Sequence, residues 1–143
     1  MQTVSVMQRL IDWNAAGAAV QAAVTEAAAI GVKINVAVVD SSGTLMAFLR
    51  MPNAPLHSIE IAIDKAYTAA SFGLPTHLWH DALQAHSPAV QDGIPRRARF
   101  VAFGGGLPIL EQGVMIGAIG VSGASEEQDQ QCAQAGLRAI GLN

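Results

Sequence analysis

The sequence predicts an α+β fold in which helices pack on an antiparallel sheet. Segments with apolar residues at helical spacing alternate with short runs rich in β-branched residues, so the apolar period changes between 3.6 and 2. The strand-type runs are joined by short turn sequences, whereas parallel strands need long crossovers. We therefore expect a layered, single domain over residues 1–143, with the element order α-β-β-α-α-β-β-β-α.

The first two expected helices have clear ends. The first covers about residues 11–30, is rich in alanine and stops at Gly31, a residue that readily adopts the left-handed conformation. The second covers about residues 58–72, with apolar side chains at helical spacing, and stops at Gly73.

The other two expected helices have recognisable beginnings. Thr76 follows Pro75 and is a good N-cap for a shorter helix that continues to about residue 85. Residues 87–95 are expected to be irregular, with at most one helical turn. Ser125 and Gln128 match a capping box, which predicts a final helix over about residues 126–140.

Five strands are expected, four of them in hairpins. The turn sequence at residues 40–43 joins the first pair, and Gln112-Gly113 joins the last pair. A short strand is expected to lead into the three consecutive glycines that start at Gly104. The expected strands cover residues 33–39, 44–50, 99–103, 107–111 and 114–121.

Charge is scarce in this chain. Charged residues make up 13% of the 143 residues and hydrophobic residues 51%, with a net charge of −3, whereas an average domain is about 25% charged. So few charged side chains leave much apolar surface, and we therefore expect a homo-oligomer with apolar interfaces. The negative net charge argues against nucleic acid as a partner.

Several other classes of protein are excluded. Charged residues interrupt every apolar run before it could span a bilayer, and the hydrophobicity excludes intrinsic disorder. Residues 1–6 do not resemble a secretory signal, so we expect a cytoplasmic protein. The single cysteine, Cys132, excludes an intramolecular disulfide and is interpreted as a small core residue.

Gly104, Gly105 and Gly106 form the most unusual local feature. Three glycines in a row are entropically costly, so they are expected where positive φ is needed or where something approaches the main chain closely. They form either a turn between strands or a set of N–H groups that face a ligand. Arg96, Arg97 and Arg99 precede them and are either a positive patch suited to a carboxylate or propionate, or charges that protect an edge strand.

The second helix carries a polar face. Glu60, Asp64 and Tyr67 have i, i+4, i+7 spacing, and Arg50 is the expected partner of the two carboxylates. Lys65 lies about 100° around the helix, among alanines. The pattern indicates either a structural ion pair or a polar ligand site that uses Lys65, Tyr67 or Thr68.

The histidines give weaker indications. His77 and His80 lie one helical turn apart, but no further ligand follows at a metal-site spacing, so they are interpreted as an exposed polar face without a metal. His57 precedes the second helix, where it could ligate haem iron, act as an acid or base, or do neither.

Several stretches together resemble the GlcG/HbpS family over nearly the whole chain. The matching stretches are Val38-Val39-Asp40-x-x-Gly43, Phe48-x-Arg50-Met51-x-x-Ala54, Ser58-Ile59-x-Ile61-Ala62-x-x-Lys65-Ala66-Tyr67-Thr68-Ala69-Ala70, Phe72-Gly73-x-Pro75-Thr76, Phe103-Gly104-Gly105-Gly106-x-Pro108-Ile109 and residues 117–124 with Gln128-Asp129. The resemblance implies a profilin-like layered fold, dimers that build larger homo-oligomers, and binding of a small ligand, which is haem or a corrinoid in described members. Some relatives support haem with a histidine in the first helix, which this chain lacks. The resemblance therefore leaves iron ligation to His57, to Thr68 or to another subunit.

Three hypotheses follow. The leading one is a small-ligand-binding protein for haem, another tetrapyrrole or a small organic acid. Its pocket would be lined by the residues Arg50, Lys65, Tyr67, Thr68 and Gly104–Gly106, with Arg96 or Arg99 attracting an anionic group. The alternative is a metal-free lyase or isomerase for a small aromatic or hydroxy acid. In that enzyme a desolvated Lys65 would have a lowered pKa, and Tyr67 or Glu60 would move protons. The third hypothesis is a purely structural assembly module.

Overall fold

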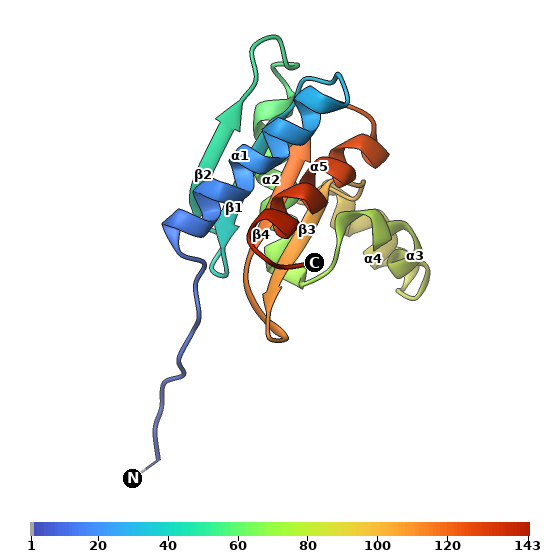
Figure 1. Ribbon diagram of the computed structural model, residues 1–143. Helices are drawn as coiled ribbons and strands as arrows, with labels where there is room; N and C mark the ends of the chain where they lie inside the picture. The colour runs from blue at the N-terminus through green and yellow to red at the C-terminus, as the bar shows by residue number, and fades with distance from the viewer. Residues whose placement is uncertain (1) are drawn as a thin grey trace.

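A computed structural model describes residues 2–143, which form one four-stranded antiparallel sheet with helices on both faces (Figure 1). The strands are β1 (Asn35–Asp40), β2 (Leu45–Arg50), β3 (Gly106–Glu111) and β4 (Val114–Ser122), in the order β2-β1-β4-β3. β1 and β2 form one hairpin and β3 and β4 the other, and the two hairpins join through antiparallel pairing of β1 with β4. The outer strands β2 and β3 are therefore the two edges of the sheet.

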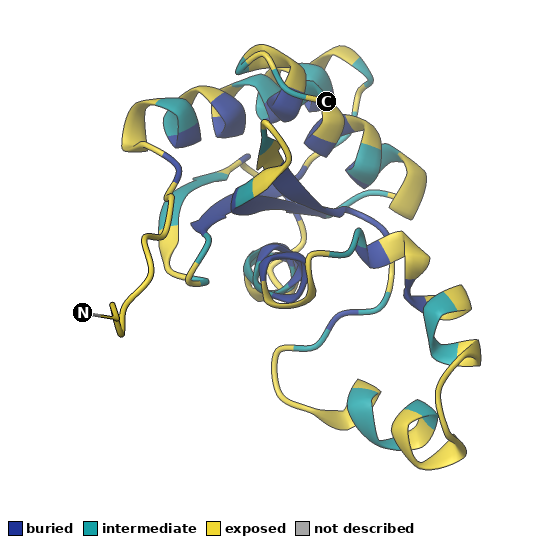
Figure 2. Cartoon of the chain, turned by 90° about the horizontal axis from the view of Figure 1, so that it is seen from below, coloured by how far each residue is buried: buried dark blue, intermediate teal, exposed yellow. Residues whose placement is uncertain are grey.

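Helices cover the two faces unequally. α1 (Trp13–Ala29) and α5 (Glu126–Ala139) lie side by side on one face, and α2 (Ser58–Phe72) lies on the other (Figure 2). The fit of α2 on β4 is close because Gly120 has no side chain: an added Cβ would lie 2.1 Å from the carbonyl oxygen of Ala62. Lys65 of α2 is thereby brought against the middle of the sheet.

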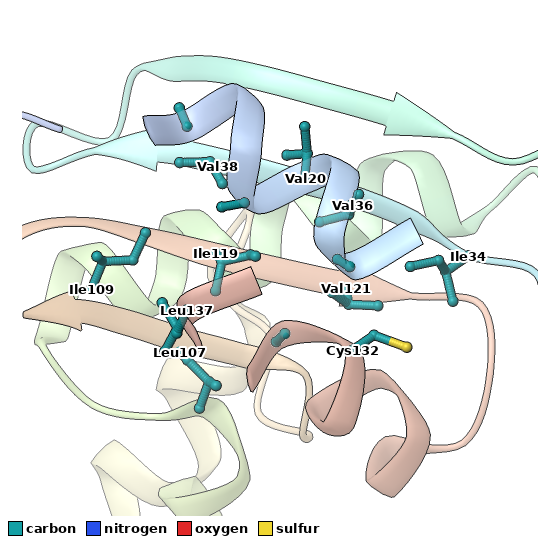
Figure 3. Close-up of a cluster of buried hydrophobic side chains, with 14 of the residues drawn as sticks. Val20, Ile34, Val36, Val38, Leu107, Ile109, Ile119, Val121, Cys132 and Leu137 are labelled. Atoms are coloured by element: carbon teal, nitrogen blue, oxygen red, sulfur yellow. The ribbon is translucent and has the colours of Figure 1, made fainter. Parts of the chain in front are cut away.

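The larger hydrophobic cluster fills the space between the sheet and the helices α1 and α5 (Figure 3). Ile34, Val36, Ile119 and Val121 are fully buried there, and small alanines on the inner side of α1 allow the helix to pack closely. The alanine-rich composition of the first helix is therefore explained by packing. A smaller cluster lies between α2 and the opposite face of the sheet.

Most elements agree with the sequence predictions. The first helix, both hairpins and the second helix are confirmed, and Gly73 ends α2 in the left-handed conformation at φ 65°. At the start of α5, Ser125 and Gln128 form the predicted capping box. The α+β class with an antiparallel sheet is confirmed.

Two predicted features are wrong, and the element order changes with them. Residues 99–103 are not a strand, because Arg99 has a φ of 67° and the main chain of this loop bonds to Thr68 of α2. Thr76 is not an N-cap: its hydroxyl accepts a hydrogen bond from the N–H of Gly106 at 2.9 Å. Residues 2–143 thus contain four strands, not five.

The segment between α2 and β3 is mostly helical. It contains two short 3₁₀ helices, η1 (Thr76–Leu78) and η2 (Ile94–Arg96), and two short α-helices, α3 (Trp79–Gln84) and α4 (Pro88–Gly93). The sequence predicts irregular chain with at most one helical turn over residues 87–95, whereas α4 and η2 make most of this stretch helical. α3 and α4 project to one side of the sheet (Figure 1). Within residues 2–143, every helix is too short or too polar to cross a bilayer.

Candidate functional site

Lys65 and Asp129 form a buried ion pair between α2 and α5. The Nζ atom of Lys65 donates to Asp129 Oδ2 at 3.0 Å and to the carbonyl oxygen of Val121 at 2.8 Å. The two side chains are only 1% and 3% exposed. The ring of Phe103 lies over the ammonium, with its centroid 5.0 Å from Nζ. The pair therefore ties both helices to the end of β4.

Burial shifts the pKa of both groups toward the neutral form. Loss of water lowers the pKa of the Lys65 ammonium, and the charge of Asp129 partly opposes this effect. Burial likewise raises the pKa of the Asp129 carboxyl, opposed by Lys65 and by the hydrogen bond from the N–H of Ala124. Because Lys65 is enclosed by protein, a substrate could reach its ammonium only if this packing opened.

The three glycines are explained by packing against this pair. An added Cβ on Gly105 would lie 2.4 Å from the oxygen of Val121 and 2.7 Å from Lys65 Nζ, and its φ is 126°. The N–H of Gly104 donates to Glu126 Oε1 at 2.7 Å, and the N–H of Gly106 donates to Thr76. Those two N–H groups are therefore occupied, and the hypothesis that they face a ligand is wrong for both.

The polar face of α2 is confirmed, but the prediction that Arg50 pairs with its carboxylates is wrong. Asp64 accepts a hydrogen bond from Nε of Arg99 at 2.9 Å, and the guanidinium of Arg99 lies 3.6 Å from the centroid of the Tyr67 ring. Arg50 instead donates to Asn35 and to the carbonyl oxygen of Ala54. The left-handed conformation of Arg99 turns its side chain back onto α2, which the strand prediction for this segment could not anticipate.

A cavity of about 200 Å³ opens beside this contact, between α2 and the loop after η2. We call it the aromatic–arginine cavity. It is lined by Tyr67, Phe72, Ile94, Arg97, Arg99 and Phe100, among others. Its walls are mostly apolar, and Arg97 and Arg99 are among the lining residues, although Arg99 is paired with Asp64.

An aromatic cluster supports the cavity. Phe72, Trp79 and Phe100 contact one another edge to face, with ring centroids 4.8 to 6.0 Å apart. Trp79 is buried, and its indole Nε1 has no hydrogen-bond acceptor among residues 2–143. A buried N–H without an acceptor is uncommon in folded proteins.

Thr68 fixes the loop that forms one wall of the cavity. Its hydroxyl donates to the carbonyl oxygen of Arg99 at 2.9 Å and accepts from the N–H of Val101 at 3.1 Å. The hydroxyl is thus engaged within the protein, which argues against Thr68 as an iron ligand. Thr68 is also among the residues that line the cavity.

The remaining predicted residues lie elsewhere. Arg96 pairs with Asp92 on the exposed surface of α4 and η2. His57 and Glu60 are exposed and line a separate cavity with Leu56 and Ile59. Within the described part of the chain, no three His, Cys, Asp or Glu side chains are grouped as metal ligands.

The structure therefore divides the predicted site in two. Lys65 and the glycines form a tightly packed, buried centre. Tyr67, Thr68 and Arg99 line the cavity. Arg50, Arg96 and His57 belong to neither group.

Sequence reasoning missed other residues of these two places. Asp129 belongs to a stretch that matches the family, but nothing in the local sequence pairs it with Lys65, 64 residues away. The aromatic cluster of Phe72, Trp79 and Phe100 is also absent from the sequence predictions. The one available signal is that these three are most of the Phe and Trp residues between residues 72 and 103. Arg97 lies in the predicted positive patch, and only the structure shows that it, rather than Arg96, lines the cavity.

The fold and the site define a class of small α+β domains in which an antiparallel sheet carries a buried Lys–Asp pair beside an aromatic cavity. The family model described as "Haem degrading protein HbpS-like" matches residues 11–138. The chain belongs to this HbpS-like family, which is related to the C-terminal haem-binding domain of PduO.

Relatives and solved structures agree with this assignment. An uncharacterised 15.0 kDa protein from the dhaT–dhaS intergenic region of Citrobacter freundii is 38% identical over 117 residues, 82% of each chain. The crystal structure of ORFY from Klebsiella pneumoniae has a TM-score of 0.90 at 32% identity, covering 100% of this chain and 99% of ORFY. PduOC, solved as a haem complex, has a TM-score of 0.85 at 34% identity, covering 94% of this chain and 97% of PduOC.

Proposed function

We propose that this protein is a cytoplasmic homo-oligomer that binds haem or a related tetrapyrrole at the aromatic–arginine cavity. The observation that carries the proposal is the combination of mostly apolar, partly aromatic walls with two arginines, Arg97 and Arg99, among the lining residues. A tetrapyrrole with carboxylate side chains needs both features, because its ring is apolar and its propionates are anionic. The haem complex of PduOC supports this choice of ligand.

The cavity fits one edge of such a ligand. Its volume of about 200 Å³ is below the roughly 300–1,000 Å³ of pockets that enclose drug-sized ligands. The rest of the macrocycle would extend out of the cavity, where a second copy of the chain would cover it.

Tyr67 is the candidate iron ligand in this cavity. Tyrosine oxygen serves as an axial haem ligand in catalase, and Tyr67 lines the cavity next to Arg99. His57, the histidine considered from the sequence, lines a different cavity. When bound, haem would supply redox and oxygen chemistry, and Arg97 and Arg99 would hold its propionates.

Titration with hemin tests the proposal, with Arg97→Gln and Arg96→Gln as a matched pair. Arg97 lines the cavity, whereas Arg96 pairs with Asp92 outside it. One lost charge-assisted hydrogen bond costs about 1.5–3 kcal/mol, so Arg97→Gln should weaken hemin binding by about 10- to 100-fold. Arg96→Gln should bind like the wild type. A wild-type protein without a Soret shift, or equal weakening in both variants, would overturn the proposal.

The spectrum of the complex tests the ligand assignment separately. Tyr67→Phe should move the Soret and charge-transfer bands of bound hemin, and His57→Ala should leave them unchanged. The opposite result would assign the iron to His57 and to the cavity at the start of α2.

The volume of the cavity favours a second candidate, a small aromatic carboxylate. One aromatic ring would pack against Phe72 and Phe100, and its carboxylate would face Arg97 or Arg99. Benzoate, used as the probe, should then bind in the cavity and compete with hemin. Saturable benzoate binding without any hemin binding would favour this candidate over the tetrapyrrole.

The lyase or isomerase hypothesis receives less support from the geometry. Lys65 is buried against Asp129, Tyr67 lines the cavity, and Glu60 is exposed on the outer side of α2. The three groups therefore do not face one common space in which a small acid could contact all of them.

A further inference from the structure

The chain of residues 2–10 extends away from the body of the domain (Figure 1), and every residue in it is exposed. Val4, Val6 and Met7 are 101%, 93% and 98% exposed. Residues 2–8 carry no charge, and the alternation of Val4 and Val6 with polar residues is typical of a strand. A neutral, β-prone segment of this kind is an aggregation hazard unless another surface covers it.

The base of this segment is fixed, so it leaves the domain in a defined direction. The N–H of Ile11 donates to the carbonyl oxygen of Ile116 at 2.9 Å. The hydroxyl of Ser41 donates to the carbonyl oxygen of Arg9 at 2.7 Å, and the guanidinium of Arg9 pairs with Glu111. The segment is therefore anchored between the β1–β2 turn and the β3–β4 turn.

The two edges of the sheet differ in how well they are protected. β3 contains Pro108, which has no N–H and so interrupts the row of main-chain donors that a docking strand would use. β2, with the sequence Leu-Met-Ala-Phe-Leu-Arg, contains neither proline nor lysine, and Leu45 is 45% exposed. The free edge of β2 is therefore the better acceptor for an additional strand.

We propose that residues 3–8 of one subunit dock as an antiparallel strand on the free edge of β2 in a second copy of this chain. The docking segment and β2 (Leu45–Arg50) are equally long, about 20 Å when extended. Main-chain hydrogen bonds would supply affinity, and the alternating side chains would fix the register. Two such contacts, exchanged reciprocally, would close a two-fold dimer.

A second copy is a better partner than the segment's own β2. To turn back on its own strand, the chain would have to reverse near Arg9, whose carbonyl oxygen and side chain are held by Ser41 and Glu111. The proposal rests on the homo-oligomer proposed above but is independent of ligand binding.

Molar mass in solution tests the proposal, with the full chain and one new charge in each variant. Val6→Asp places a carboxylate in the middle of the docked strand, and Gln2→Asp places the same charge just outside it. We expect an oligomeric wild type, at least a tenfold rise in the dissociation constant for Val6→Asp, and no change for Gln2→Asp. A monomeric wild type would overturn the proposed assembly as a whole. An oligomer that Val6→Asp leaves intact would overturn the docking of residues 3–8 alone.

Disulfide trapping identifies the acceptor strand, in a Cys132→Ala background. A chain with Val6→Cys, mixed with a chain carrying Ala47→Cys in β2, should form a disulfide between the two chains. The same partner with Leu110→Cys in β3 is the control and should not. Trapping at Leu110→Cys instead, or a bond within one chain that carries both Val6→Cys and Ala47→Cys, would overturn the proposal.

Discussion

Removing one partner of the buried Lys65–Asp129 pair should destabilise the fold strongly. Lys65→Met keeps the length and most of the volume of the side chain. The decrease in the free energy of unfolding therefore reports the cost of leaving the Asp129 carboxylate buried without its partner. Because the two side chains are 1% and 3% exposed, we expect Lys65→Met or Asp129→Asn to lower the free energy of unfolding by about 3–5 kcal/mol. That is a large part of the roughly 5–15 kcal/mol by which a domain is stable.

Urea denaturation of the two single variants and the double variant measures this energy. The double variant should cost about 2 kcal/mol less than the two single losses added together, because the partners interact directly. Arg96→Gln is the control. It breaks an exposed ion pair and should change the free energy of unfolding by less than about 1 kcal/mol. Losses below about 1 kcal/mol for both single variants would refute the reasoning.

The pH dependence of Lys65→Met adds a second test. Burial raises the pKa of Asp129, and without Lys65 nothing opposes that effect as strongly. When folding raises the pKa of a carboxyl, the free energy of unfolding is lowered at every pH above the unfolded-state pKa. This destabilisation disappears below the unfolded-state pKa, where the carboxyl is protonated in both states. The deficit of Lys65→Met should therefore shrink as the pH falls from about 8 toward about 4. A deficit that stays constant over this range would contradict a buried, ionised Asp129.

Three further predictions concern other parts of the fold. Gly105→Ala should lower the free energy of unfolding by more than about 2 kcal/mol, because the φ of Gly105 is 126° and an added Cβ would clash with Val121. Gly17 lies in open space on α1, so Gly17→Ala should instead raise the free energy of unfolding by about 0.5–1 kcal/mol. Urea denaturation of the two variants makes the comparison. Burial raises the pKa of Cys132 to about 12, so a thiol reagent at about pH 8 should label the protein only after unfolding. Thr68→Val removes both hydrogen bonds that hold the cavity loop, so amide exchange at Val101 should accelerate while exchange in β1 stays unchanged.

Local patterns were enough to predict most of the secondary structure. The capping box at Ser125, the glycine stop at Gly73 and the two short hairpin turns each depend on neighbouring residues, and each was confirmed. Residues 99–103 were misread because their conformation depends on Thr68, 31 residues before Arg99. A hydrogen bond over that separation leaves no periodic signal in the sequence.

The candidate site was predicted less completely for the same reason. The polar face of α2 and the position of Lys65 among alanines follow from helical geometry, and the structure confirms both. The partners of these residues come from distant segments: Asp129 lies 64 residues from Lys65, and Arg99 lies 35 residues from Asp64. Only the fold brings Phe100 and Arg97 against α2.

The position of bound hemin tests the central claim most directly. Ferric haem broadens the NMR signals of nearby amides, so the ¹⁵N-labelled protein reports where the ligand lies. The account predicts that signals from residues 67–72 and 97–100 disappear first, while those of α1 and α5 persist. Broadening concentrated on α1 and α5, with residues 97–100 unaffected, would contradict it.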